Sequence, residues 1–107
     1  MKDNPLVDKS RAFALKTMSV CKEIKHPLIN QLLRSATSIG ANIHEANYAH
    51  SRADFVAKMQ IALKECYETE YWLILFRDSK IIEDIQLLDN CLELKRMLIA
   101  SCRTAKS

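Results

Sequence analysis

Turn-forming residues are almost absent from this chain of 107 residues, which contains one glycine and two prolines. A protein built from β-strands needs turn signals at intervals of roughly 8–12 residues, and this sequence does not supply them. Hydrophobic residues make up 49% of the chain and charged residues 27%, proportions that suit a folded globular protein. We therefore expect long helices, packed as a single domain over residues 1–107.

Apolar residues recur at alternating gaps of three and four, which is the spacing of a buried helical seam. In the clearest segment the seam consists of Ile29, Leu32, Ala36, Ile39, Ile43 and Ala46. The predicted helices span about residues 5–24, 27–48, 52–78 and 82–104. Four amphipathic helices with short connections predict an all-α, antiparallel up-down-up-down four-helix bundle.

Two of the predicted helices carry start signals. Asn4 before Pro5 is typical of an N-cap followed by the first helical residue. Ser51 with Asp54 three residues later resembles a capping box in which Asp replaces the usual Glu.

The cysteines Cys21, Cys66, Cys91 and Cys102 show no C-x-x-C spacing. No signal peptide follows Met1, and no run of 18 or more apolar residues could cross a membrane. These features predict a cytoplasmic protein without a membrane partner, in which the thiols are small core residues.

Positive charge is concentrated in the first half of the chain. Between residues 9 and 52, seven Lys or Arg side chains oppose two Glu side chains, whereas the second half is nearly balanced. The seven cations are Lys9, Arg11, Lys16, Lys22, Lys25, Arg34 and Arg52. Such an imbalance indicates either an ordinary solvated face or a surface for an anionic partner, and both interpretations remain open on the residues alone.

The third predicted helix is apolar well outside its seam, and the run YWLILF at 71–76 is apolar on every side. Either the core face is unusually wide, or a second face is buried against another subunit. We expect a homo-oligomer whose interface includes Tyr67, Tyr71, Trp72 and Leu75.

Gly40, the only glycine, lies within SIGANIHEA at 38–46, among other small residues. A phosphate-binding loop would need a preceding strand and more glycines, so we interpret Gly40 as a close-packing position between helices. Polar residues flank the same seam on the second and third helices. If those helices form a hairpin, Asn42 should lie near Lys58 and Ser35 near Glu65. The predicted network is Ser35, Asn42, Glu45, Lys58 and Glu65. It either sets the helix register or forms a binding or catalytic cluster.

Catalytic and metal-binding patterns are not evident. Glu65 and Glu68 share a helix face, but a di-iron bundle needs two E-x-x-H motifs and two further glutamates, a combination that this chain lacks. The three histidines, His26, His44 and His50, are scattered. We expect no metal, no cofactor, no small-molecule substrate and no enzymatic activity.

Three stretches, LLRSATSIGANIHEA (32–46), SRADFVAKMQIALKE (51–65) and CYETEYWL (66–73), resemble the bacterial family of 23S ribosomal RNA intervening-sequence proteins. The resemblance covers most of the chain and is strongest across the second and third predicted helices. It implies a small all-helical protein that often forms pentameric rings. It also implies kinship with the accessory variability determinant of diversity-generating retroelements, a basic pentamer that binds nucleic acid and a reverse transcriptase. The family's motif positions correspond here to Arg34, Ser38, Asn42, Glu45, Ser51, Asp54, Phe55, Glu65, Glu68, Tyr71 and Trp72, none of which is an accepted catalytic residue.

Taken with this resemblance, the basic half predicts a protein that binds RNA or a ribonucleoprotein. Lys and Arg would neutralise phosphates without reading bases. The alternative is a protein–protein interaction scaffold that does not bind nucleic acid.

Overall fold

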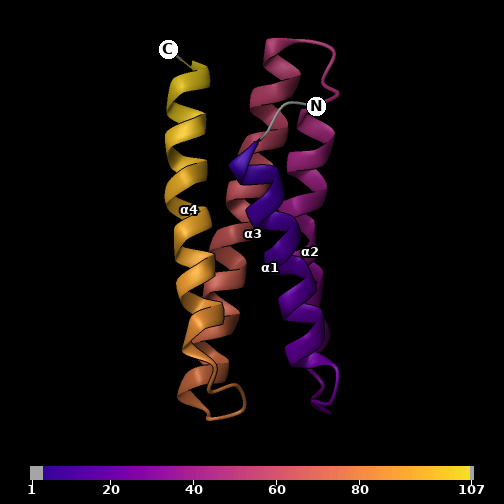
Figure 1. The fold of residues 1–107 in the computed structure, drawn as a ribbon, viewed down its shortest axis with the longest axis vertical. Helices are drawn as coiled ribbons and strands as arrows, with labels where there is room; N and C mark the ends of the chain where they lie inside the picture. The colour runs from indigo at the N-terminus through magenta and orange to yellow at the C-terminus, as the bar shows by residue number, and fades with distance from the viewer. Residues whose placement is uncertain (1–3, 107) are drawn as a thin grey trace.

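The computed structural model describes residues 4–106 and contains four helices. They are α1 (Pro5–Cys21), α2 (Ile29–Ala46), α3 (Arg52–Asp78) and α4 (Ile85–Lys106). Figure 1 shows them side by side along an axis of 42 Å, with the α1–α2 and α3–α4 connections at one end and the α2–α3 connection at the other. No strand occurs within residues 4–106, so the predicted all-α class with four helices is confirmed.

The predicted caps of α1 and α3 are present. The side-chain oxygen of Asn4 accepts the backbone N–H of Leu6 at 3.0 Å, and Ser51 Oγ accepts the N–H of Asp54 at 3.1 Å. The reciprocal half of the capping box is displaced by one residue, because Asp54 accepts the N–H of His50 at 3.3 Å. These bonds satisfy N–H groups that the first helical turn leaves without partners.

Both limits of α2 and the end of α4 lie two residues from the prediction, and two other limits differ by three residues. Helix α1 ends at Cys21 rather than about residue 24, because the chain turns there: the Ile24 N–H donates to the Cys21 carbonyl at 3.0 Å instead of continuing the helical pattern. Helix α4 begins at Ile85 rather than about residue 82. Asp84 precedes it and accepts the N–H of Gln86 at 2.9 Å, as an N-cap does.

Helix α3 ends in a Schellman turn built without glycine. Ile81 N–H donates to the Phe76 carbonyl at 2.9 Å and Lys80 N–H to the Arg77 carbonyl at 3.0 Å. Lys80 therefore takes a left-handed backbone conformation with φ of 63°, which costs a non-glycine residue about 1–2 kcal/mol. Ile82 is buried just beyond it, so apolar burial in the connection helps to offset that cost.

The seams face a common core. Every predicted seam residue of α2 is buried, and the buried residues of α1 and α4 also recur at gaps of three and four. Ile85, the first residue of α4, is 65% exposed and does not belong to this core. All four cysteines are buried and free, and the Sγ atoms of Cys66 and Cys91 lie 3.9 Å apart between α3 and α4. Burial also raises the pKa of the Cys21 thiol to about 11.

Gly40 lies where α2 approaches the backbone of α1. A methyl group added at Gly40 would meet the Ser10 carbonyl oxygen and Ser10 Oγ, each at 3.5 Å. That distance is ordinary van der Waals contact, so alanine fits, but a longer side chain would push the two helices apart.

We therefore expect opposite effects from two substitutions at this position. Gly40→Ala should raise the free energy of unfolding by up to about 1 kcal/mol, because alanine favours the helix. Gly40→Leu should lower it by about 1–3 kcal/mol through overpacking. Urea denaturation followed by circular dichroism measures both. A Gly40→Leu variant as stable as the wild type would contradict the packing interpretation.

Candidate functional site

Two of the predicted basic residues on α1, Lys9 and Lys16, bind side chains of α4. Lys9 Nζ pairs with Glu93 at 2.9 Å, and Lys16 Nζ donates to the Gln86 side chain at 2.9 Å. Both contacts join α1 to α4. Lys9 and Lys16 thus contribute to the packing of α1 against α4, and they would have to give up these contacts to bind a phosphate.

Arg34 on α2 lies at the centre of a cluster with α3. It pairs with Glu65 at 2.9 Å and with Glu68, whose carboxylate also accepts the indole N–H of Trp72 at 3.0 Å. Glu65 is only 8% exposed, so it needs a charged partner more than a surface carboxylate does. The hydrogen bonds from Arg34 and then from Trp72 hold the pKa of Glu68 below its usual range.

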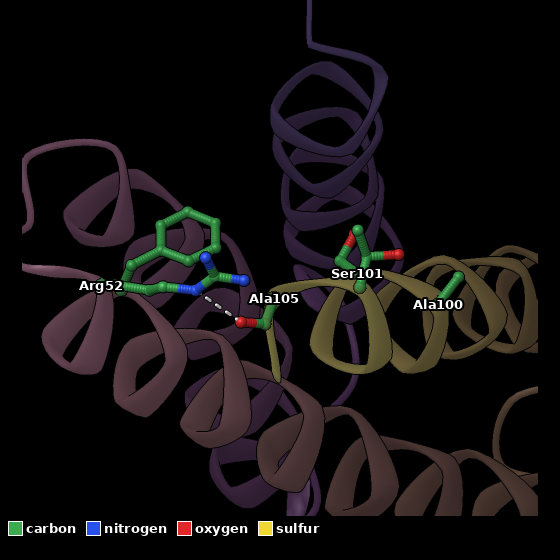
Figure 2. Close-up of a pocket in the computed structure, with 6 residues that line it drawn as sticks. Arg52, Ala100, Ser101 and Ala105 are labelled. Carbon is green, nitrogen blue, oxygen red and sulfur yellow. Dashed lines mark hydrogen bonds between the residues drawn. The ribbon is translucent and has the colours of Figure 1, made fainter. Parts of the chain in front are cut away.

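Arg52, the first residue of α3, links this helix to the last turn of α4. Its Nε donates to the backbone carbonyl of Ala105 in the last turn of α4 at 2.8 Å (Figure 2). The carbonyls of a final helical turn lack helical partners, and a cation there also complements the helix dipole. An open pocket of about 590 Å³ lies beside this contact, with Phe55 in its lining.

Arg11, Lys22 and Lys25 make up the rest of the predicted basic set, and all three are exposed. Within residues 4–106, no hydrogen bond or ion pair involves their side chains. Arg11 and Lys22 are separated by about three turns and so share one face of α1 and its C-cap. Lys25 follows in the α1–α2 connection. We call these three residues the free cations.

A groove of about 950 Å³ lies next to Lys22, between the second half of α1 and the first half of α2. Its lining includes apolar side chains from Met18, Ile24 and Leu33, and cations from Lys22 and Arg34. No carboxylate from the described part of the chain lines it. The groove therefore suits a ligand that has both an apolar and an anionic part.

The predicted polar network divides into separate contacts along α2 and α3. Glu45 pairs with Lys58 at 3.1 Å, and the Ser35 hydroxyl accepts a hydrogen bond from Thr69 at 2.9 Å. Asn42, expected near Lys58, instead donates to the Ser38 carbonyl of its own helix at 2.8 Å.

Sequence reasoning assigned Arg34 to a phosphate-binding surface and did not connect it with Glu65, Glu68 and Trp72. The sequence did contain a signal for the contact between Arg34 and Glu65. The hairpin register that placed Ser35 level with Glu65 also brings Arg34 level with Glu65, and opposite charges at one level of a helix pair attract.

Three of the four predicted interface residues form an exposed stripe along α3. Tyr67, Tyr71 and Leu75 are 50%, 60% and 39% exposed. Trp72 differs, because its ring packs beside the core and its N–H is bonded to Glu68. The ammonium of Lys95 lies 5.5 Å from the centre of the Tyr67 ring.

Two further classes of site find no support in residues 4–106. No group of three or more His, Cys, Asp or Glu side chains there is arranged to hold a metal ion. None of the described helices is long and apolar enough to span a membrane.

Comparison with known proteins finds a matching family model and a similar crystal structure. The family model described as 23S rRNA-intervening sequence protein matches residues 2–100. A crystal structure from Bacteroides thetaiotaomicron VPI-5482, described as a protein with unknown function from the S23 ribosomal protein family, is 41% identical in sequence. The alignment covers 91% of this chain and 97% of that one, with a TM-score of 0.84. No curated protein matches the sequence significantly.

The Glu68 contacts predict a pH-dependent contribution to stability. Because the pKa of Glu68 is lower in the folded state, its pairing stabilises the protein above the unfolded value, and this contribution is lost as pH falls through the folded value. Glu68→Gln should therefore lower the free energy of unfolding by about 1 kcal/mol near neutral pH and by less in acid. Urea denaturation of the wild type and the variant, from neutral pH into acid, measures the difference in their free energies of unfolding. The exposed Glu83→Gln is the matched control, and a Glu68→Gln deficit that does not shrink in acid would contradict the assignment.

Proposed function

Because this chain belongs to the family of 23S rRNA-intervening sequence proteins, we propose that it is a non-enzymatic, cytoplasmic protein that binds RNA or a ribonucleoprotein. In this proposal an antiparallel up-down-up-down bundle assembles into a homo-oligomeric ring. Lys and Arg side chains neutralise RNA phosphates and release counterions. Repetition around a ring would multiply a weak contact into a stronger one.

The observation that carries the RNA proposal is the set of free cations, Arg11, Lys22 and Lys25. Four of the seven predicted cations bind groups within the protein, whereas these three are exposed and unpaired within residues 4–106. An exposed cation without an internal partner gives up no existing contact when it binds a phosphate. The free cations are therefore better candidates than the complete basic set.

The exposed stripe on α3 supports the oligomer. Tyr67, Tyr71 and Leu75 recur at intervals of four, so they lie along one side of the helix. Aromatic residues are enriched at subunit interfaces. By resemblance to the family, the ring would be a pentamer.

A second candidate function is a protein-interaction scaffold without nucleic-acid binding. The observation that favours it is the exposure of Leu15 and Met18, at 50% and 53%, between Arg11 and Lys22 on α1. Phosphate binding does not require these apolar side chains, whereas a partner helix would bury them.

The RNA proposal predicts a specific salt dependence. Replacing Arg11, Lys22 and Lys25 together by alanine should weaken binding to a structured RNA and reduce the slope of log K against log salt by up to about 3. Alanine replacement of Arg96, Arg103 and Lys106 on α4 removes the same charge and should have a smaller effect. Filter binding at several salt concentrations measures both. If wild-type protein has no measurable RNA affinity at about 50 mM salt, the proposal fails.

The oligomer proposal predicts that charge on the α3 stripe disrupts assembly. Tyr71→Glu combined with Leu75→Glu should shift sedimentation velocity profiles toward a smaller species, because two carboxylates would be buried unpaired. Gln60→Glu, elsewhere on the exposed surface of α3, is the control. A wild-type protein that sediments as a monomer at micromolar concentration would rule out the ring.

A further inference from the structure

We propose that the groove between α1 and α2 receives an unpaired nucleobase of a single-stranded RNA segment, while Lys22 and Lys25 contact the flanking phosphates. This inference rests on the proposed RNA binding and goes beyond it, because it specifies single-stranded RNA. The phosphates of a duplex could be neutralised by the free cations alone. The apolar lining of the groove has no role in such a contact.

The chemistry of the groove matches a nucleotide. Met18 and Leu33 provide apolar surface from opposite helices, and the cavity of about 950 Å³ lies within the range of roughly 300–1,000 Å³ common for small-ligand sites. Asn30 also lines it, and its amide both donates and accepts, as the edge of a base requires.

Arg34 supplies a flat surface at the same groove. Its two terminal nitrogens are held by Glu65 and Glu68, so the guanidinium is fixed by bonds directed along its plane. Half of the Arg34 side chain remains exposed. Unstacked bases in RNA complexes commonly stack on arginine guanidinium planes as well as on aromatic rings. The ion pairs that make Arg34 a poor phosphate ligand thus make it a rigid stacking surface.

Charge at the groove favours an anionic ligand. Lys22 lines the groove and Lys25 follows closely in the sequence. Among the described residues that line the groove, only the thiol of Cys21 could carry negative charge, and burial raises its pKa to about 11, which keeps it neutral. A phosphodiester beside the groove would therefore meet cations without an opposing charge in the lining.

Met18 and Leu15 provide a matched pair of variants. Both are apolar, about half exposed and one turn apart on α1, but only Met18 lines the groove. Met18→Asp and Leu15→Asp change the net charge equally and replace exposed side chains, so their general electrostatic effects on RNA should be similar. If Met18→Asp weakens RNA binding more than Leu15→Asp does, the extra loss of affinity arises from the groove.

The experiment measures fluorescence anisotropy with labelled oligoadenylate of about 12 nucleotides, single-stranded or paired with oligouridylate, at about 50 mM salt. Wild-type protein should bind the single strand more tightly than the duplex. Met18→Asp should weaken single-strand binding about tenfold more than Leu15→Asp does, whereas the two variants should affect duplex binding equally. Circular dichroism verifies that both variants are folded.

Equal effects of the two variants on the single strand, or equal wild-type affinity for strand and duplex, would overturn the groove inference and leave the RNA proposal intact. Absence of any wild-type affinity would overturn both. Photo-cross-linking of wild-type protein to an oligomer carrying one 4-thiouridine gives an independent test. Cross-links should map to residues 18–37, and cross-links confined to other segments would contradict the proposal.

Discussion

The carboxylate of Glu65, nearly buried between α2 and α3, must be paired, and the arrangement around it follows from that requirement. A buried carboxylate without a cation would cost several kcal/mol. Arg34 supplies the cation and in doing so fixes the level at which the two helices meet. The Thr69–Ser35 hydrogen bond and the Lys58–Glu45 ion pair occur at compatible levels along the same helix pair. Polar contacts that agree on one register exclude slipped alternatives, which the apolar seam by itself tolerates more readily.

The same requirement changes the role of Arg34 in the site. A cation bound by two carboxylates has little remaining attraction for phosphate, but it is held in one orientation. The groove between α1 and α2 thus combines a wall held in place by ion pairs with exposed cations beside it. One set of residues would provide shape, and the other would provide long-range attraction.

Periodicity made much of the fold predictable. The limits of α3 match the prediction because Ser51 marks its start in the sequence and a continuous seam runs through it. The first and last helices were predicted less well, since their limits depend on local turn geometry. In the sequence Asp84 is one acidic residue among several, and only the structure shows that its side chain caps α4. No composition rule predicts that Lys80 adopts a left-handed conformation.

The candidate site was harder to predict from the sequence than the fold was. The sequence identifies cations but not their partners, and Lys9 meets Glu93 from the far end of the chain. Groove shape depends on side chains from two helices together, so no single segment encodes it.

The neighbouring thiols of Cys66 and Cys91 have a consequence for how the protein responds to oxidants. Cys66 and Cys91 are fully buried, with Sγ atoms 3.9 Å apart, and a disulfide would require them to approach to about 2.05 Å within a packed layer. Hydrogen bonding to Cys66, together with burial, also raises the pKa of the Cys91 thiol, which suppresses the reactive thiolate. Burial and the raised pKa of Cys91 therefore disfavour oxidation of this pair despite its proximity. The bundle should keep the same helix packing whether its surroundings are reducing or oxidising.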